Sequence, residues 1–96
     1  MLLDELRQKK SAIDEILHKY GASRIRVFGS VSRKCERPDS DIDFLVDFPR
    51  GYDLFRQRLP MQEALELLFS RRVDLIPEHE LNLHLRSSIF NEAIEL

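Results

Sequence analysis

The sequence has few of the residues that stabilise or anchor a chain by means other than its own core. It contains one cysteine, Cys35, no tryptophan, three glycines and four prolines in 96 residues. A single cysteine excludes an internal disulfide and suits a reducing compartment, so we expect a cytoplasmic protein. No apolar run approaches the roughly 20 residues that span a bilayer, and the charged first residues do not resemble a signal peptide. We therefore expect no association with a membrane.

An excess of basic charge is also missing. Charged residues make up 33% of the chain, but the formal net charge is −2. Since no global basic field would attract a nucleic acid, we expect no direct nucleic-acid binding. The 43% hydrophobic content is ordinary for a soluble domain, and the length fits one modest core. We expect residues 1–96 to form a single domain, without a second domain for a substrate.

Hydrophobic periodicity and chain breakers predict an α+β fold, with a small β-sheet of three or more strands packed by helices. Pro60 interrupts the second predicted helix, so we expect a break near Leu59. The C-terminal apolar residues alternate in part like a strand, which leaves an edge strand as an alternative for the last residues. The predicted helices span residues 2–20, 53–70 and 82–93, and the predicted strands span 24–28, 42–48 and 72–76.

A Gly-Ser pair follows the first predicted strand. Gly29 lets the backbone approach a ligand and adopt a positive φ, and Ser30 can cap a helical turn over residues 30–34. Backbone N–H groups at such a turn bind anions, and Arg33 makes the loop locally basic. The pattern favours a polyphosphate ligand, although a plain strand-to-helix turn with a serine cap would give the same dipeptide.

Paired carboxylates begin the second predicted strand. Asp41 and Asp43 are two residues apart, so they point to the same face of a strand. Two like charges at this separation raise each other's pKa unless a cation lies between them, and Mg²⁺ prefers such oxygen ligands. Asp74, in the third predicted strand, would approach them if the two strands are neighbours. Three acids can hold two metals, but a solvated turn and a strand-end charge would also account for these residues.

Taken together, these residues resemble one family. The pattern Gly-Ser-x10-Asp-x-Asp, followed by Val-Asp-Leu, is similar to that of the nucleotidyltransferase superfamily related to DNA polymerase β. The small size resembles the minimal nucleotidyltransferase (MNT) antitoxins of HEPN/MNT toxin–antitoxin pairs. The resemblance implies a palm-like nucleotidyltransferase fold, and it extends from the first predicted helix to residue 76 and beyond.

The resemblance also implies roles for individual residues. Gly29, Ser30 and Arg33 would bind the nucleotide phosphates. Lys34 stands where many minimal members carry glycine. The three carboxylates would be catalytic and would hold Mg²⁺, as two ions: Asp41, Asp43 and Asp74.

The implied reaction is transfer of AMP from ATP to a hydroxyl, expected to be a tyrosine of a HEPN-type ribonuclease toxin. The chain would act as the antitoxin and supply the nucleotide half of the site, with the acceptor in trans. Exposed apolar residues toward the C-terminus could form part of that contact, or could simply pack in the core: Leu81, Leu83, Leu85 and Phe90. Alternative functions are an antitoxin that neutralises its partner by binding only, and a homodimeric small-molecule nucleotidyltransferase.

Overall fold

The computed structural model describes residues 2–96 and begins with two short helices, α1 (Leu2–Gln8) and α2 (Lys10–Lys19). The sequence predicts a single helix over 2–20, and this is wrong at Lys9, where φ is −98° and ψ is 18°. The hydrogen bond from the Lys9 N–H to the Glu5 carbonyl still forms, so the chain bends without unwinding. Leu6 and Ile13, on either side of the bend, are both fully buried in the same core.

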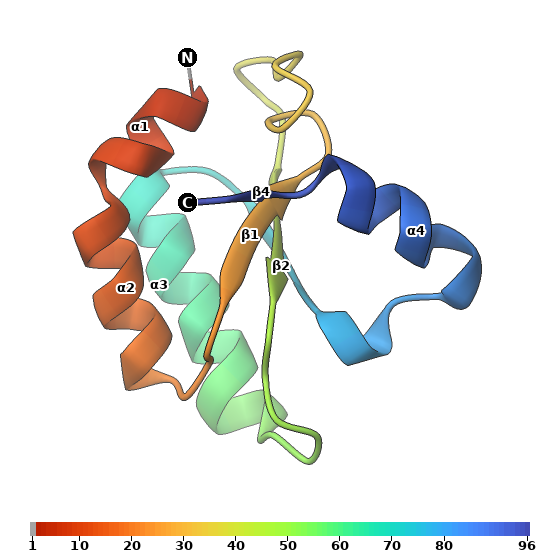
Figure 1. Ribbon diagram of the computed structural model, residues 1–96. Helices are drawn as coiled ribbons and strands as arrows, with labels where there is room; N and C mark the ends of the chain where they lie inside the picture. The colour runs from red at the N-terminus through yellow and green to blue at the C-terminus, as the bar shows by residue number, and fades with distance from the viewer. Residues whose placement is uncertain (1) are drawn as a thin grey trace.

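A mixed four-stranded sheet forms the centre of the molecule (Figure 1). Its order is β3-β2-β1-β4, with β2 and β3 parallel and the other two pairs antiparallel. The predicted α+β class is confirmed, and each predicted strand is present with ends that differ by one or two residues. The strands are β1 (Ile25–Phe28), β2 (Ile42–Val46), β3 (Val73–Pro77) and β4 (Ile94–Glu95).

The segment between β2 and β3 is helical in two parts, as Pro60 predicts. A π-helical turn, η1 (Leu54–Arg58), leads directly into α3 (Leu59–Phe69), which carries Pro60 in its first turn. Proline is favoured there because the first N–H groups of a helix have no intrahelical acceptor. The Asp53 side chain accepts hydrogen bonds from two backbone N–H groups and caps η1.

The two faces of the sheet differ in character. Helices α1, α2 and α3 lie together on one face (Figure 1), where alternate strand residues join their buried side chains in the core. Because side chains alternate across a strand, the intervening residues point to the opposite face. The core face carries Ile25, Val27, Ile42, Phe44, Val46, Val73 and Leu75. The opposite face carries Arg26, Phe28, Asp43, Leu45, Asp74 and Ile76.

The chain ends on this opposite side. A 3₁₀ turn, η2 (Glu78–Glu80), precedes α4 (Leu83–Glu92), which confirms the helix expected over 82–93. Strand β4 then pairs with β1, so the alternative edge strand is present as well. The alternative that the C-terminal apolar residues pack in the core is wrong for Leu83, which is 81% exposed, and for Leu85, which is 56% exposed.

No helix within residues 2–96 is both long enough and apolar enough to cross a membrane.

Candidate active site

The Gly-Ser turn lies at the end of β1, where the sequence predicts it. Gly29 is buried and has φ +71°, a conformation that glycine adopts without steric cost. The Arg33 N–H donates to the Gly29 carbonyl at 3.1 Å, and the Cys35 N–H donates to the Ser30 carbonyl at 2.9 Å. The helical turn expected over 30–34 is therefore a single hydrogen-bonded turn that does not continue into a helix.

Lys34 holds a second left-handed position in this loop, with φ +58°. A residue with a Cβ pays a steric cost there that glycine does not. The loop thus keeps a geometry suited to glycine even though a lysine stands at this position.

Asp43 lies directly against the Gly-Ser turn. A Cβ built on Gly29 would be 2.1 Å from the Asp43 Oδ2 atom, far inside van der Waals contact. The β1–β2 register explains this proximity, because Asp43 is paired with Phe28, the residue before Gly29. Only glycine at position 29 lets the turn and this carboxylate lie side by side.

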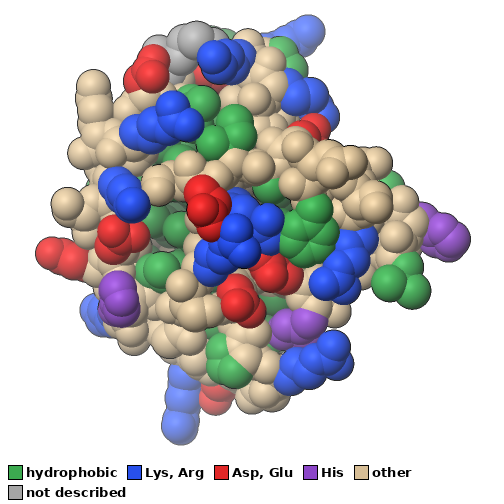
Figure 2. Space-filling view, viewed as in Figure 1, with side chains coloured by type: hydrophobic (Ala, Val, Ile, Leu, Met, Phe, Trp, Pro, Cys, Tyr) green, Lys and Arg blue, Asp and Glu red, His purple; other side chains and the backbone are tan. Residues whose placement is uncertain are grey.

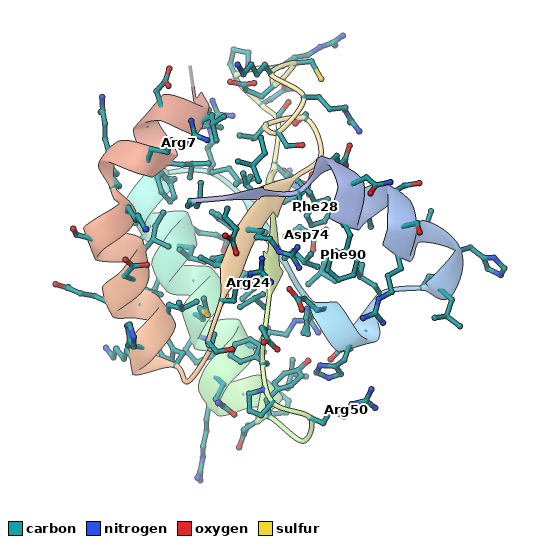
Figure 3. All side chains as sticks on the ribbon, in the orientation of Figure 1. Arg7, Arg24, Phe28, Arg50, Asp74 and Phe90 are labelled. Atoms are coloured by element: carbon teal, nitrogen blue, oxygen red, sulfur yellow. The ribbon has the colours of Figure 1, made fainter. Side chains whose placement is uncertain are left out.

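The other two predicted carboxylates lie close to Asp43. Asp74 is its direct partner in the parallel β2–β3 register, so both occupy the sheet face away from the core. Figure 3 shows Asp74 on the side of the sheet toward α4. Asp41 is exposed and precedes β2, which begins at Ile42. Strand pairing thus brings together acids that are more than 30 positions apart in the chain.

Burial and the neighbouring acids raise the pKa of Asp43. Its pKa is raised from 3.8 to about 6, first because of burial and then because of the negative charges of Asp74 and Asp41. The positive charge of Arg33 acts in the opposite direction. Arg33 thus compensates the negative charge of the site only in part, and a bound cation would neutralise the remainder.

The loop before β2 is fixed by an arginine from the α3–β3 connection. Arg71 Nη1 donates to the carbonyls of Arg37 and Ser40, at 3.0 Å each. A hollow of about 260 Å³ opens here beside Asp41, whereas a larger one of about 340 Å³ lies on α3 at Glu63, Glu66 and Leu67, away from the carboxylates. The smaller hollow is lined by Pro38, Asp39, Ser40, Asp41, Ser70, Arg71 and Arg72.

The donor set suits a hard divalent cation. Within the described part of the chain, no three His, Cys, Asp or Glu side chains form a ready-made metal cage. Mg²⁺ does not need one, because it is often held by one or two carboxylates together with waters and substrate phosphates. The adjacent carboxylates and the raised pKa of Asp43 fit such a partly open site.

The sequence reasoning missed one residue of this site, Glu92. Its carboxylate accepts from the Gly29 N–H and from Arg33 Nη1, each at 3.1 Å. The alternative of an edge strand at the C-terminus could have indicated it. Strand β4 pairs Ile94 with Val27, and this pairing brings Glu92 to the end of β1. In helical terms alone, Glu92 is an ordinary acid in the last turn of α4.

A family model described as "Nucleotidyltransferase domain" matches residues 9–96. A Methanocaldococcus jannaschii protein, provisionally named protein adenylyltransferase MJ0435, is 33% identical over 100% of this chain and 99% of its own length. Protein adenylyltransferase MntA of Thermococcus cleftensis is 34% identical over 83% of this chain and 80% of its own length.

Solved structures agree with this assignment. One described provisionally as a minimal nucleotidyltransferase superposes with a TM-score of 0.85 and 41% identity, covering 98% of this chain and 95% of its own. A toxin–antitoxin structure with AMP-PNP shares the fold, with a TM-score of 0.74 and 22% identity over 88% of this chain and 69% of its own. The chain is therefore a minimal member of the nucleotidyltransferase domain family, an enzyme class that transfers nucleotidyl groups.

Proposed function

We propose that this chain transfers AMP from ATP to a hydroxyl of a partner HEPN-type toxin, expected to be a tyrosine, in a Mg²⁺-dependent reaction that makes it an antitoxin. One observation carries the proposal: the Gly29 turn lies against Asp43, and Asp43 is paired with Asp74 on the sheet face away from the core. Two relatives are named as protein adenylyltransferases, and a protein of the same fold was solved in a toxin–antitoxin complex with AMP-PNP.

Each predicted residue has a role in this proposal. The backbone N–H groups around Gly29 and Ser30, with the Arg33 guanidinium, would bind the β- and γ-phosphates. Asp41, Asp43 and Asp74 would hold Mg²⁺, expected as two ions. Bound there, Mg²⁺ would neutralise charge on the α-phosphate and on the departing pyrophosphate.

The transfer itself is a displacement at phosphorus. The acceptor oxygen forms a bond to the α-phosphorus, the bond from that phosphorus to the bridging oxygen breaks, and pyrophosphate leaves. Asp74 is exposed on the site face next to Asp43, so its carboxylate can take the proton from the acceptor hydroxyl. Most of the rate enhancement would come from positioning and charge neutralisation.

The acceptor would come from the partner chain. Leu83 and Leu85 are apolar residues exposed on α4, which covers the same sheet face as the carboxylates. An exposed apolar patch next to a reactive site fits contact with another protein. The partner would thus bind where its hydroxyl can reach the α-phosphate.

The test is incubation of this chain and its partner toxin with labelled ATP and Mg²⁺. We expect label in the partner with the wild type, and none with the Asp41→Asn/Asp43→Asn double variant. Asp47→Asn is the matched control, because Asp47 follows the opposite end of β2 and accepts a hydrogen bond from Ser23. Label that stays in ATP with a competent partner would refute the proposed enzyme activity, and transfer by the double variant would refute the metal site.

The exposed leucines of α4 also fit an antitoxin that acts by binding alone. In that case the double variant would still neutralise the partner, with no AMP transferred. A neutralisation assay run beside the labelling assay separates the two functions.

A further inference from the structure

The carboxylate of Glu92 is hydrogen-bonded to the same donors that the proposed function assigns to phosphate. The Gly29 N–H donates to its Oε1 atom and Arg33 Nη1 donates to its Oε2 atom, each at 3.1 Å. A carboxylate with two oxygens bound by an amide and a guanidinium resembles a bound phosphate in charge and in hydrogen bonding. We infer that Glu92 is an internal substitute for phosphate, which a nucleoside triphosphate must displace in order to bind.

Charge makes joint occupancy unfavourable. Beyond the effect of burial, the negative charge of Glu92 also helps to raise the pKa of Asp43. Glu92 therefore lies near the carboxylates as well as at the Gly29 turn. A triphosphate bound at the Gly29 turn would place further negative charge next to this carboxylate. Like charges at such close range repel strongly in a partly buried site. The inference rests on the proposed function, because it takes Gly29 and Arg33 as phosphate donors.

The element that carries Glu92 is held lightly enough to move. Helix α4 has no buried residue, whereas α1, α2 and α3 each contribute two or three buried side chains to the core. Apart from Glu92, it is held by Phe90, whose ring centroid lies 4.6 Å from the guanidinium carbon of Arg26, and Arg26 is in turn paired with Glu78. Segments with few buried apolar contacts open at low free-energy cost. Figure 1 shows α4 on the side of the sheet opposite the three core helices.

Because the nucleotide must first displace Glu92, its apparent affinity is lower than that of a site with free donors. When only part of the population has free donors, the observed affinity equals the intrinsic affinity multiplied by that fraction. Removing the charge of Glu92 weakens the internal contact and the repulsion at once, so the triphosphate should bind more tightly. An ionic hydrogen bond of this kind corresponds to roughly a tenfold change in affinity.

The chain offers a matched control. Glu95 lies three residues further on, in β4, and its carboxylate pairs with Arg24 on the surface. Glu95→Gln removes the same charge from the same C-terminal segment without touching the Gly29 turn. Each variant removes one negative charge, so the net charge changes equally in the two. The face of the molecule seen in Figure 2 carries acidic and basic side chains intermixed.

The test is calorimetric titration of wild type, Glu92→Gln and Glu95→Gln with AMP-PNP and Mg²⁺, with circular dichroism as a check of folding. We expect about tenfold tighter binding for Glu92→Gln than for the other two proteins. Equal binding by all three would overturn the inference and leave the proposed function standing. Binding by none would overturn both.

A measurement on the wild type covers the case in which Glu92→Gln does not fold. Amide hydrogen exchange of α4 is followed with and without AMP-PNP and Mg²⁺. Faster exchange in residues 83–92 on nucleotide binding is the expected result, because α4 loses its contact with the turn. Unchanged or slower exchange in those residues would overturn the inference.

Discussion

Gly29 meets two requirements at the residue scale. Its φ of +71° favours glycine, and a Cβ there would collide with the Asp43 carboxylate. Gly51 has the first property without the second. Its φ is +82°, and within residues 2–96, its own chain neighbours aside, no heavy atom lies within 4 Å of an added Cβ. Substitutions at these two glycines therefore distinguish the effect of backbone strain alone from the effect of a collision with Asp43.

We expect Gly29→Ala to lower AMP transfer by about a hundredfold or more, because a displacement of about 1 Å at a reacting centre can have this effect. Gly51→Ala should keep its activity and lose only about 1 kcal/mol of folding free energy, the usual cost of a positive φ for alanine. Initial rates and thermal melts of both variants check this. Equal loss of activity in the two variants would show that the contact with Asp43 is unimportant.

Asp43 reports the charge of the site through its pKa of about 6. Since this value lies above the ordinary 3.8, the folded protein binds the proton more tightly than the unfolded chain between these two values. Stability from this group is therefore present at low pH and is lost as pH rises through about 6.

Asp43→Asn should consequently stabilise the metal-free protein at pH 7.5 by about 1 kcal/mol, after allowance for solvent screening of a half-buried group. The difference should be much smaller near pH 4, and Mg²⁺ should stabilise the wild type more than the variant. Melts at the two pH values, with EDTA or with Mg²⁺, measure it, and Asp47→Asn is the control. A variant that is less stable than the wild type at pH 7.5 with EDTA would contradict the account.

At the scale of elements, the sequence predicts what depends on neighbours in the chain. The β-branched and aromatic residues of Ile25-Arg26-Val27-Phe28 predict a strand, and the proline at position 60 predicts a helix start, each within one or two residues of its observed place. The bend at Lys9 was missed, because no proline or glycine marks it in the sequence. The β-strand pairing of Asp74 with Asp43 could be stated only as a condition, since register depends on contacts distant in sequence.

Helix α4 shows the same limit more strongly. Its existence follows from spacing, but its place over the carboxylates depends on Phe90 packing against Arg26 of β1. Glu92 could not be assigned to the site without that placement. The resemblance of Gly29, Ser30 and the three carboxylates to a known pattern covered the rest of the candidate site.

Phe90→Ala tests how α4 is held. Loss of the contact with Arg26 should lower stability by about 1 kcal/mol and speed hydrogen exchange in residues 83–92, while the core helices keep their protection. Leu83→Ala is the matched control on the same helix, because Leu83 is 81% exposed. Uniformly faster exchange in every helix of the Phe90 variant would show instead that α4 is part of the main folding unit.

At the scale of the whole molecule, one face of the sheet packs against the core and the other carries the candidate active site. The buried cluster lies between one sheet face and the three helices α1, α2 and α3, so the other face is free to carry charged residues. That face holds the Gly29 turn, the carboxylates and the lightly packed α4. A partner chain that approaches α4 would reach the proposed site directly.

The most direct test of the proposed function is the intact mass of the partner toxin after coexpression with this chain. The account predicts a partner heavier by one or more AMP units, located on a tyrosine by fragmentation, and an unmodified partner with the Asp41→Asn/Asp43→Asn variant. A partner that is neutralised by the wild-type chain yet keeps its unmodified mass would contradict the account.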